Sequence, residues 1–177
     1  MSKQLWVMDP AHSEVTFKVR HMMITNVTGT FENSTGSMHS DLPDFTDAEI
    51  HFEAEVVSVN TRNSQRDEHL RTNDFFDAAS HPKLSFKSSK LEKVGDKDYL
   101  LHGDITIKGV TKQITLQVAY KGLVVDPWGL MRAGFEMNGA VQRADFGLLW
   151  NASTEDGSIV LSDEVKLLMN IQMIKQV

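Results

Sequence analysis

The stretch LHGDITIKGVTKQITLQV, residues 101–118, consists of two alternating runs joined by a Lys-Gly pair. Apolar residues occupy nearly every second position, up to Ile107 in the first run and from Ile114 onward in the second. A period of two places these side chains on one face of a β-strand. The Lys108-Gly109 pair between the runs is typical of a two-residue hairpin turn. The stretch therefore predicts two antiparallel strands that share an apolar face.

The same alternation recurs along most of the chain. The remaining alternating runs lie at residues 14–20, 50–56, 83–87 and 165–173, and shorter stretches that favour strands lie at 28–31, 36–39 and 128–141. One apolar and one polar face per strand is typical of antiparallel sheets and not of strands linked by crossover helices. Together these runs predict about eight strands, and closing them into a barrel removes the exposed strand edges. We therefore predict an all-β fold, a single domain over residues 1–177 that forms an eight-stranded antiparallel β-barrel.

One segment, residues 60–82, shows no alternation. Within it, Ser64 followed three residues later by Asp67 fits a capping box, which predicts a short helix over about residues 64–72. Leu70 is the only large apolar residue of this helix, so the helix cannot fold alone. We expect it to lie across one end of the barrel, held there by Leu70, Phe75 and Phe76.

Composition and charge exclude several classes of protein. The 177 residues include no cysteine, which excludes disulfides and thiolate metal sites. Eighteen Lys and Arg against 24 Asp and Glu give a net charge of −6, which offers no electrostatic basis for binding nucleic acid or an anionic lipid surface. No run of 18 apolar residues is present, so we expect no segment to span a membrane. The first residues lack the apolar core of a signal peptide. We therefore expect a cytoplasmic location, or a periplasmic one if a signal segment has been removed.

Catalytic and metal-binding motifs are not evident. No two of the seven histidines have the spacing of a metal-binding pair, so no metal site is predicted; they are His12, His21, His39, His51, His69, His81 and His102. There is no Gly-x-Ser-x-Gly elbow and no glycine-rich phosphate loop. An enzyme is still an alternative if Asp67, His69, His12 and Asp145 converge in a pocket. A third alternative is a solid barrel that acts as a protein-interaction module.

The Arg66–Asp67–His69 group has two interpretations. Arg66 and Asp67 could form structural ion pairs with Asp145 or Arg143 across the barrel mouth. Alternatively, the group could bind the polar head of a ligand.

The interior of an eight-stranded barrel is either filled by side chains or holds one small ligand. In residues 129–141 the residues of one parity include several small side chains; this set is Gly129, Met131, Ala133, Phe135, Met137, Gly139 and Val141. Small residues there either leave room for a ligand or mark bends of the barrel. Nine methionines add adaptable apolar surface. These residues alone do not decide between an interior filled by side chains and one that holds a ligand.

Several motifs in order resemble the YceI-like family. The first is WVMDPAHSEVTF at residues 6–17, followed by His21-Met22. The others are SVNT at 58–61, RDEHLR at 66–71 with DFFD at 74–77, GDITIKGVT at 103–111, RADFG at 143–147 and DEV at 163–165. The resemblance runs from Trp6 to about Ile174 and so covers nearly the whole chain.

This resemblance implies a lipocalin-like barrel that binds a long apolar lipid, typically a polyisoprenoid, inside the barrel. A similar amphiphile, such as a fatty lipid, is an equivalent expectation. The family also implies no cofactor, no established catalysis and homodimers. Many members carry a signal peptide and are periplasmic, a pattern from which we expect this chain to depart.

Residue parity predicts which side chains face the ligand. These are Phe17, Val19, Phe31, Phe52, Phe86, Ile105, Ile107, Leu116, Val118, Met131, Phe135, Met137, Met169 and Ile171, with Phe75 and Phe76 near one end.

Overall fold

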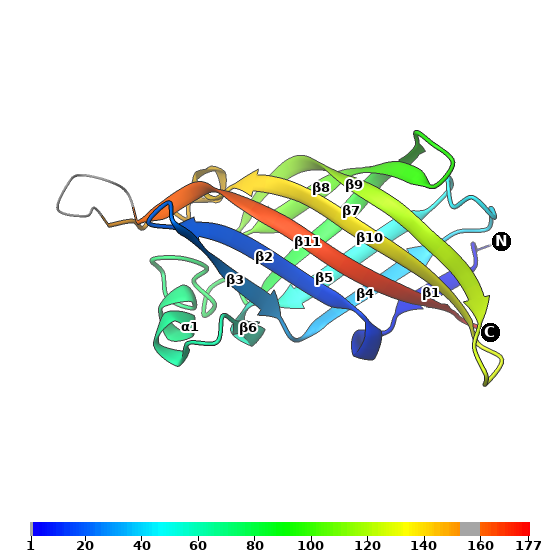
Figure 1. Cartoon of the computed structure of the whole chain (residues 1–177), viewed down its shortest axis with the longest axis horizontal. Coiled ribbons are helices and arrows are strands. Elements are labelled where there is room, and N and C mark those ends of the chain that lie inside the picture. Colours follow the sequence, from blue (N-terminus) through cyan, green and yellow to red (C-terminus); the bar gives the residue numbers. More distant parts are fainter. Residues whose placement is uncertain (1, 153–159) are drawn as a thin grey trace.

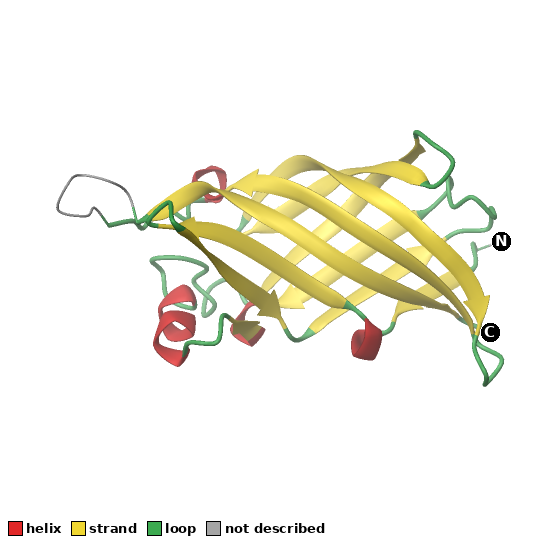
Figure 2. Ribbon diagram, in the orientation of Figure 1, coloured by secondary structure: helices red, strands yellow, loops and turns green. Residues whose placement is uncertain are grey.

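The computed structural model describes residues 2–152 and 160–177. In these residues the chain forms eleven antiparallel strands, one α-helix and three short 3-10 helices (Figures 1 and 2). The strands are β1 (Leu5–Met8), β2 (Glu14–His21), β3 (Thr25–Phe31), β4 (Ser34–His39), β5 (Glu49–Glu55), β6 (Val59–Asn60), β7 (Lys83–Lys93), β8 (Asp98–Ile107), β9 (Val110–Val125), β10 (Met131–Gln142) and β11 (Leu161–Lys175). The helices are η1 (Pro10–His12), η2 (Val56–Ser58), α1 (Ser64–Leu70) and η3 (Arg143–Phe146).

The eleven strands occupy eight positions in one closed ring. The ring runs β1-β4-β5-β7-β8-β9-β10-β11 and closes because β11 also pairs with β1. The other three strands continue positions already in the ring. β2 follows β1 after the η1 break, β4 follows β3 after Glu32 and Asn33, and β6 follows β5 after η2. The prediction of an eight-stranded antiparallel barrel is confirmed, although β1 and β6 were not predicted as strands.

The turn between β8 and β9 has the conformation that its sequence indicated. Lys108 and Gly109 both adopt positive φ angles, 50° and 75°, and Ile107 pairs with Val110 across the turn. Two consecutive left-handed residues define the type I′ turn, whose twist matches that of the flanking strands. Glycine adopts this conformation without steric cost.

Helix α1 lies at one end of the barrel (Figure 1), as predicted, but its boundaries differ from the expectation. The N-cap is Asn63 and not Ser64, because the Asn63 side chain accepts the Arg66 backbone N–H at 3.0 Å. Asp67 is therefore free for another role, described below, and the helix ends at Leu70 instead of residue 72. No helix of the described residues has the length and apolar character needed to cross a bilayer.

The other end of the barrel is filled by an aromatic cluster. Phe45, in the loop between β4 and β5, packs edge-on against Trp6, Tyr120 and Phe135, with ring centroids 5.5, 5.6 and 5.6 Å away. The loop is held by the Asp47 carboxylate, which accepts hydrogen bonds from the Ser40 hydroxyl and from two backbone N–H groups. This set of rings is here called the aromatic plug, and the β4–β5 loop that carries Phe45 lies at the end opposite α1 (Figure 1).

Arg132 links three parts of the chain at the plugged end. Its guanidinium donates to Asp126 at 2.8 Å, to Asp9 at 2.7 Å and to Gln172 at 2.8 Å. Asp126 also accepts the backbone N–H groups of Trp128 and Leu130 at 2.9 Å each. Arg132 therefore joins the β9–β10 turn, the start of η1 and strand β11.

We expect the Arg132→Met variant to unfold at a lower temperature than the wild type near neutral pH. Arg132 is the main cause of the lowered pKa of Asp126, and it adds to His12 in lowering the pKa of Asp9. A carboxyl with a lowered pKa stabilises the fold above its ordinary value of 3.8, and this contribution is lost as the pH falls toward the lowered pKa. The difference in melting temperature should therefore narrow below about pH 4, as measured by circular dichroism.

Lys121→Met is the matched control, because the Lys121–Glu136 pair is 3.7 Å apart and exposed. Exposed pairs of this kind contribute little to stability. If the difference in melting temperature between the wild type and Arg132→Met stayed constant down to acidic pH, the carboxylates of Asp126 and Asp9 would not be its source.

Candidate ligand-binding cavity

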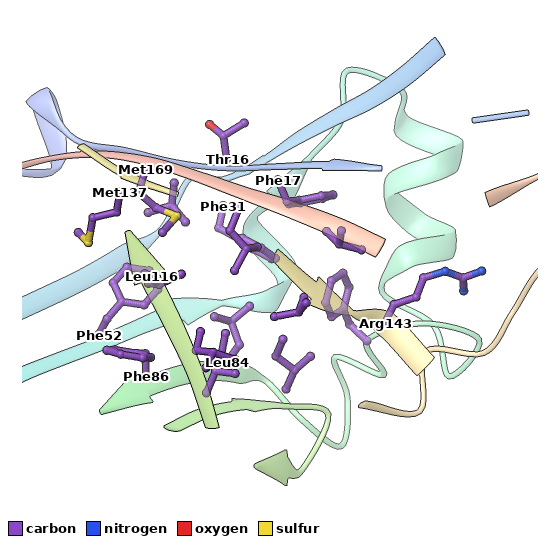
Figure 3. A pocket seen from close by; sticks show the side chains of 18 of the residues that line it. Thr16, Phe17, Phe31, Phe52, Leu84, Phe86, Leu116, Met137, Arg143 and Met169 are labelled. Carbon is purple, nitrogen blue, oxygen red and sulfur yellow. The ribbon is translucent and has the colours of Figure 1, made fainter. Parts of the chain in front are cut away.

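The barrel encloses a cavity of about 580 Å³. Its lining consists mainly of apolar side chains that come from strands all around the ring, including Phe17 of β2, Phe52 of β5, Leu116 of β9 and Met169 of β11 (Figure 3). Ligand pockets are commonly about 300–1,000 Å³ and mostly apolar. The cavity therefore has the size and surface of a site for an apolar molecule.

Most of the residues predicted from parity line this cavity. They are Phe17, Val19, Phe31, Phe52, Phe75, Phe76, Phe86, Ile105, Ile107, Leu116, Val118, Phe135, Met137, Met169 and Ile171. Met131 is not among the lining residues, because it begins β10 near the plugged end, opposite Val125. That the lining residues contact a ligand stays a prediction.

Further lining residues were not included in the sequence prediction. Leu84 and Leu167 lie in alternating runs, so residue parity could have identified them. Leu148 and Trp150 lie in the loop after η3, where no periodicity marks a facing direction. Only the tertiary structure brings that loop to the cavity.

Burial of the lining differs from one side of the barrel to the other. Inward side chains of β7 and β8, such as Phe86 and Leu101, are buried. Inward side chains of β2 and β11, such as Phe17, Leu167 and Met169, are only half-buried, although they point inward. A side chain inside a barrel stays accessible only where it faces empty space, so the cavity borders the β2–β11 wall. Phe52 of β5 and Met137 of β10 are half-buried lining residues too, so the empty space also reaches these strands.

Glycines of the wall make room for neighbouring side chains. The Phe17 ring lies directly over Gly29, its cross-strand partner, where an added Cβ would be 2.3 Å from Cζ of the ring. Leu116 covers Gly139 in the same way, with Cδ2 at 2.5 Å from such a Cβ. Of the small residues considered from sequence, Gly129 instead lies in the β9–β10 turn with φ 84°.

The cavity opens at the end that carries α1. Three exposed polar residues of the α1 segment, Asn63, Gln65 and Arg66, are part of its lining. At the opposite end, Trp6 and Phe45 of the aromatic plug are buried and do not line the cavity. The opening beside α1 is called the mouth below.

The arginine and aspartate of α1 hold Thr61 at the mouth. Asp67 is buried and accepts the Thr61 N–H at 2.9 Å and its hydroxyl at 2.5 Å. The Arg66 guanidinium donates to the Thr61 hydroxyl at 2.7 Å and to its carbonyl at 2.6 Å. The predicted ion pairs with Asp145 or Arg143 are therefore wrong, because both charged groups bind Thr61 within their own segment.

Arg143 fixes the loop that follows η3. Its guanidinium donates to the carbonyls of Leu148 and Trp150 at 2.7 Å each and to that of Ser162 at 2.9 Å. Burial lowers the pKa of this guanidinium. Trp150 in turn packs edge-on against the His69 ring, with centroids 4.7 Å apart. These contacts join the loop to α1 at the mouth.

The four residues of the enzymatic alternative do not converge. His69 binds Asp74 at 2.8 Å, Asp67 binds Thr61, and His12 lies on η1, where it binds Asp9 at 2.7 Å. No hydrogen bond within the described residues links any two of Asp67, His69, His12 and Asp145. In the same part of the chain, no group of three His, Asp or Glu side chains is placed to hold a metal ion.

The turn between β2 and β3 is unusual. The Ile24 N–H donates to the His21 carbonyl at 3.2 Å, and the two intervening residues, Met22 and Met23, have φ angles of 51° and 60°. Asparagine and glycine usually occupy such turns, because a left-handed residue with a Cβ costs about 1–2 kcal/mol. Here two methionines do so while remaining exposed.

Comparison with known proteins identifies the family. Residues 6–173 match the model of the YceI-like domain. The chain belongs to the YceI-like family. Protein YceI of Escherichia coli is 34% identical over 165 residues, which are 93% of this chain and 83% of that protein.

Solved structures share the YceI-like fold. The crystal structure of a Campylobacter jejuni YceI protein superposes with a TM-score of 0.76 at 30% identity, covering 89% of this chain and 90% of that one. A domain from Saccharophagus degradans, described as a polyisoprenoid binding domain, gives a TM-score of 0.74 at 18% identity and covers 98% of this chain and all of that one. At that identity the likeness shows the fold alone.

The Gly29→Ala variant tests the packing of Phe17 over the cavity wall. Because the new Cβ would overlap the Phe17 ring, we expect the free energy of unfolding to fall by about 1–3 kcal/mol in chemical denaturation. Gly134→Ala is the control, since its Cβ would meet Lys121 at an ordinary 3.6 Å. Equal effects of the two substitutions would contradict this packing.

The double variant Met22→Asn, Met23→Gly tests the strain of the β2–β3 turn. We expect it to raise the free energy of unfolding by about 1 kcal/mol, because both new residues tolerate the left-handed conformation. Met22→Ala, Met23→Ala is the matched control, which removes the same side chains but keeps the strain. If the Asn-Gly variant raised the free energy of unfolding no more than the double alanine variant does, the turn would be unstrained.

Proposed function

We propose that this YceI-like protein binds a long-chain apolar lipid, a polyisoprenoid or a similar amphiphile, inside the barrel and carries, stores or sequesters it. The observation that supports this proposal most directly is the apolar cavity of about 580 Å³, whose lining reaches exposed residues of the α1 segment. The barrel itself is elongated (Figure 1), and a chain-like ligand suits such a barrel better than a compact ligand does.

The energetics favour such a ligand without strong polar contacts. Each buried methylene group contributes about 0.8 kcal/mol, so ten of them contribute about 8 kcal/mol before ordering costs. That gross value corresponds to a dissociation constant on the order of micromolar. An isoprenoid tail can therefore bind through its hydrocarbon alone.

A protein with the same fold is consistent with this proposal. The Saccharophagus degradans domain that shares this fold is described as polyisoprenoid-binding. The polar groups near the mouth support a binding role over a catalytic one, because Asp67 and Arg143 hold the backbone of their own surroundings. The cytoplasmic location and the homodimer stay predictions from the sequence.

The test is solvent extraction of freshly purified protein followed by mass spectrometry. We expect about one lipid molecule per chain in the wild type. In Met137→Trp the larger ring occupies the cavity, since Met137 lies between Val118 and Met169 on the inner face, and the lipid content should fall severalfold. Asn138→Trp, one residue further on the same strand and exposed, should keep the wild-type content.

Circular dichroism and the melting temperature establish that both variants fold. The proposal is contradicted if the wild type neither retains a lipid nor takes up added geranylgeraniol. It is also contradicted if the two tryptophan variants behave alike while folded.

A further inference from the structure

The mouth of the cavity carries an exposed apolar surface that the proposed function does not explain. Met22, Met23 and Ile24 at the tip of the β2–β3 turn are 44%, 50% and 77% exposed, and Leu149 in the loop after η3 is 68% exposed. These four residues are called the mouth patch. Both segments lie at the end of the barrel that carries α1 (Figure 1).

Hydrogen bonds from the tip and from the residues that follow Leu149 hold both segments against the start of β11. The Met22 N–H donates to the Val160 carbonyl at 2.6 Å, and the Val160 N–H donates to the Ala152 carbonyl at 2.9 Å. Asn151 binds both the N–H and the carbonyl of Leu161, at 3.0 and 2.9 Å. The tip and the loop therefore flank the same strand end.

The mouth patch is continuous with the apolar lining of the cavity. His21, directly before the tip, lines the cavity, and so do Leu148 and Trp150 on either side of Leu149. Val160 and Leu161, between the two segments, line it as well. An apolar surface thus leads from the interior to the outer rim without interruption by a charged residue in these segments.

The conformation of the tip indicates that its apolar character has a role. Met22 and Met23 hold left-handed backbone conformations that Asn and Gly adopt at lower cost. Strained residues of this kind concentrate at functional sites, because folding alone does not favour them. Exposed methionine also adapts to irregular apolar partners.

We propose that the mouth patch docks on the surface of a lipid bilayer, so that the cavity receives and releases its ligand directly from the membrane. The inference rests on the proposed function, because only an apolar ligand gains from a path that avoids water. In water, each exposed methylene of the ligand opposes its release. When the tip lies at the boundary between headgroups and acyl chains, the ligand passes into the bilayer without exposing its methylenes to water.

The size and charge of the region favour a bilayer over a second protein. A stable protein interface takes about 800 Å² and 20–30 residues from each partner, and the mouth patch has four. The Arg20 guanidinium donates to the Met23 carbonyl at 2.6 Å, which places a cation directly behind the apolar tip. Interfacial segments have this arrangement, with apolar residues at the acyl boundary and basic residues at headgroup level.

The net charge of −6 provides no general attraction to anionic lipids, so docking should depend on apolar contact. We therefore expect binding to vesicles of neutral phosphatidylcholine, with little dependence on salt. Screening weakens electrostatic attraction between exposed charges, whereas apolar burial is not reduced by it.

The experiment measures co-flotation of the full chain with phosphatidylcholine vesicles. The triple variant Met22→Asn, Met23→Gly, Ile24→Thr removes the apolar tip but favours the same turn, so it should fold at least as stably as the wild type. We expect its vesicle affinity to fall by about tenfold or more, while Met22→Leu, Met23→Leu keeps wild-type binding. The triple variant should also take up a dansyl-labelled farnesyl probe from vesicles more slowly than the wild type does.

Trp128→Ala is the matched control. Trp128 is 81% exposed in the β9–β10 turn, at the plugged end of the barrel, and its loss should leave vesicle binding unchanged. The inference is overturned if the wild type does not bind vesicles, if the triple variant binds equally well, or if binding is lost with Trp128. It is likewise overturned if the triple variant converts a wild-type dimer into monomers in light scattering, because the mouth patch would then join two copies.

The two proposals can fail separately. Binding of geranylgeraniol delivered in detergent does not involve vesicles, so it tests the cavity alone. If that binding is absent while vesicle binding depends on the tip, the docking surface is supported and the proposed function fails. If the ligand binds equally to wild type and triple variant but vesicle binding does not depend on the tip, only the docking surface is overturned.

Discussion

Closure of the ring by β11 is the constraint on which the rest of the structure depends. One edge of this strand pairs with β10 along its length, whereas the other edge pairs first with β2 and then with β1. The change of partner occurs at η1, where Pro10 interrupts the strand and Asp9 turns toward Arg132. Backbone pairing on both edges leaves no open sheet edge, and it fixes the circumference within which a cavity can exist.

Residue parity was sufficient to predict most of the barrel. The run from Leu101 to Val118 appears as β8 and β9 with the expected turn at Lys108 and Gly109. Parity specifies which face of a strand a residue occupies, and the inward placement of Phe17 and Met169 followed from it. It failed at Met131, because a correct face near the end of a strand does not ensure that the cavity extends that far.

Other features depend on tertiary contacts that leave no periodic signal. Phe45 reaches the barrel interior from a loop held by Asp47, and Trp150 reaches the mouth through hydrogen bonds from Arg143. The capping role of Asn63 replaced that expected of Ser64, because Asp67 is used to bind Thr61. The inward faces of the strands either meet or leave a cavity between them, depending on the size of the ring. The sequence of a single strand therefore does not predict the cavity.

The aromatic plug makes the interior a blind tube. A chain that enters such a tube must leave by the same opening, in the reverse order, so the barrel cannot serve as a conduit from one end to the other. The ring of Phe135 lines the cavity and packs against Phe45 of the aromatic plug behind it. For a chain-like ligand of the kind proposed, the depth from these rings to the mouth would limit the length of hydrocarbon that the barrel can enclose.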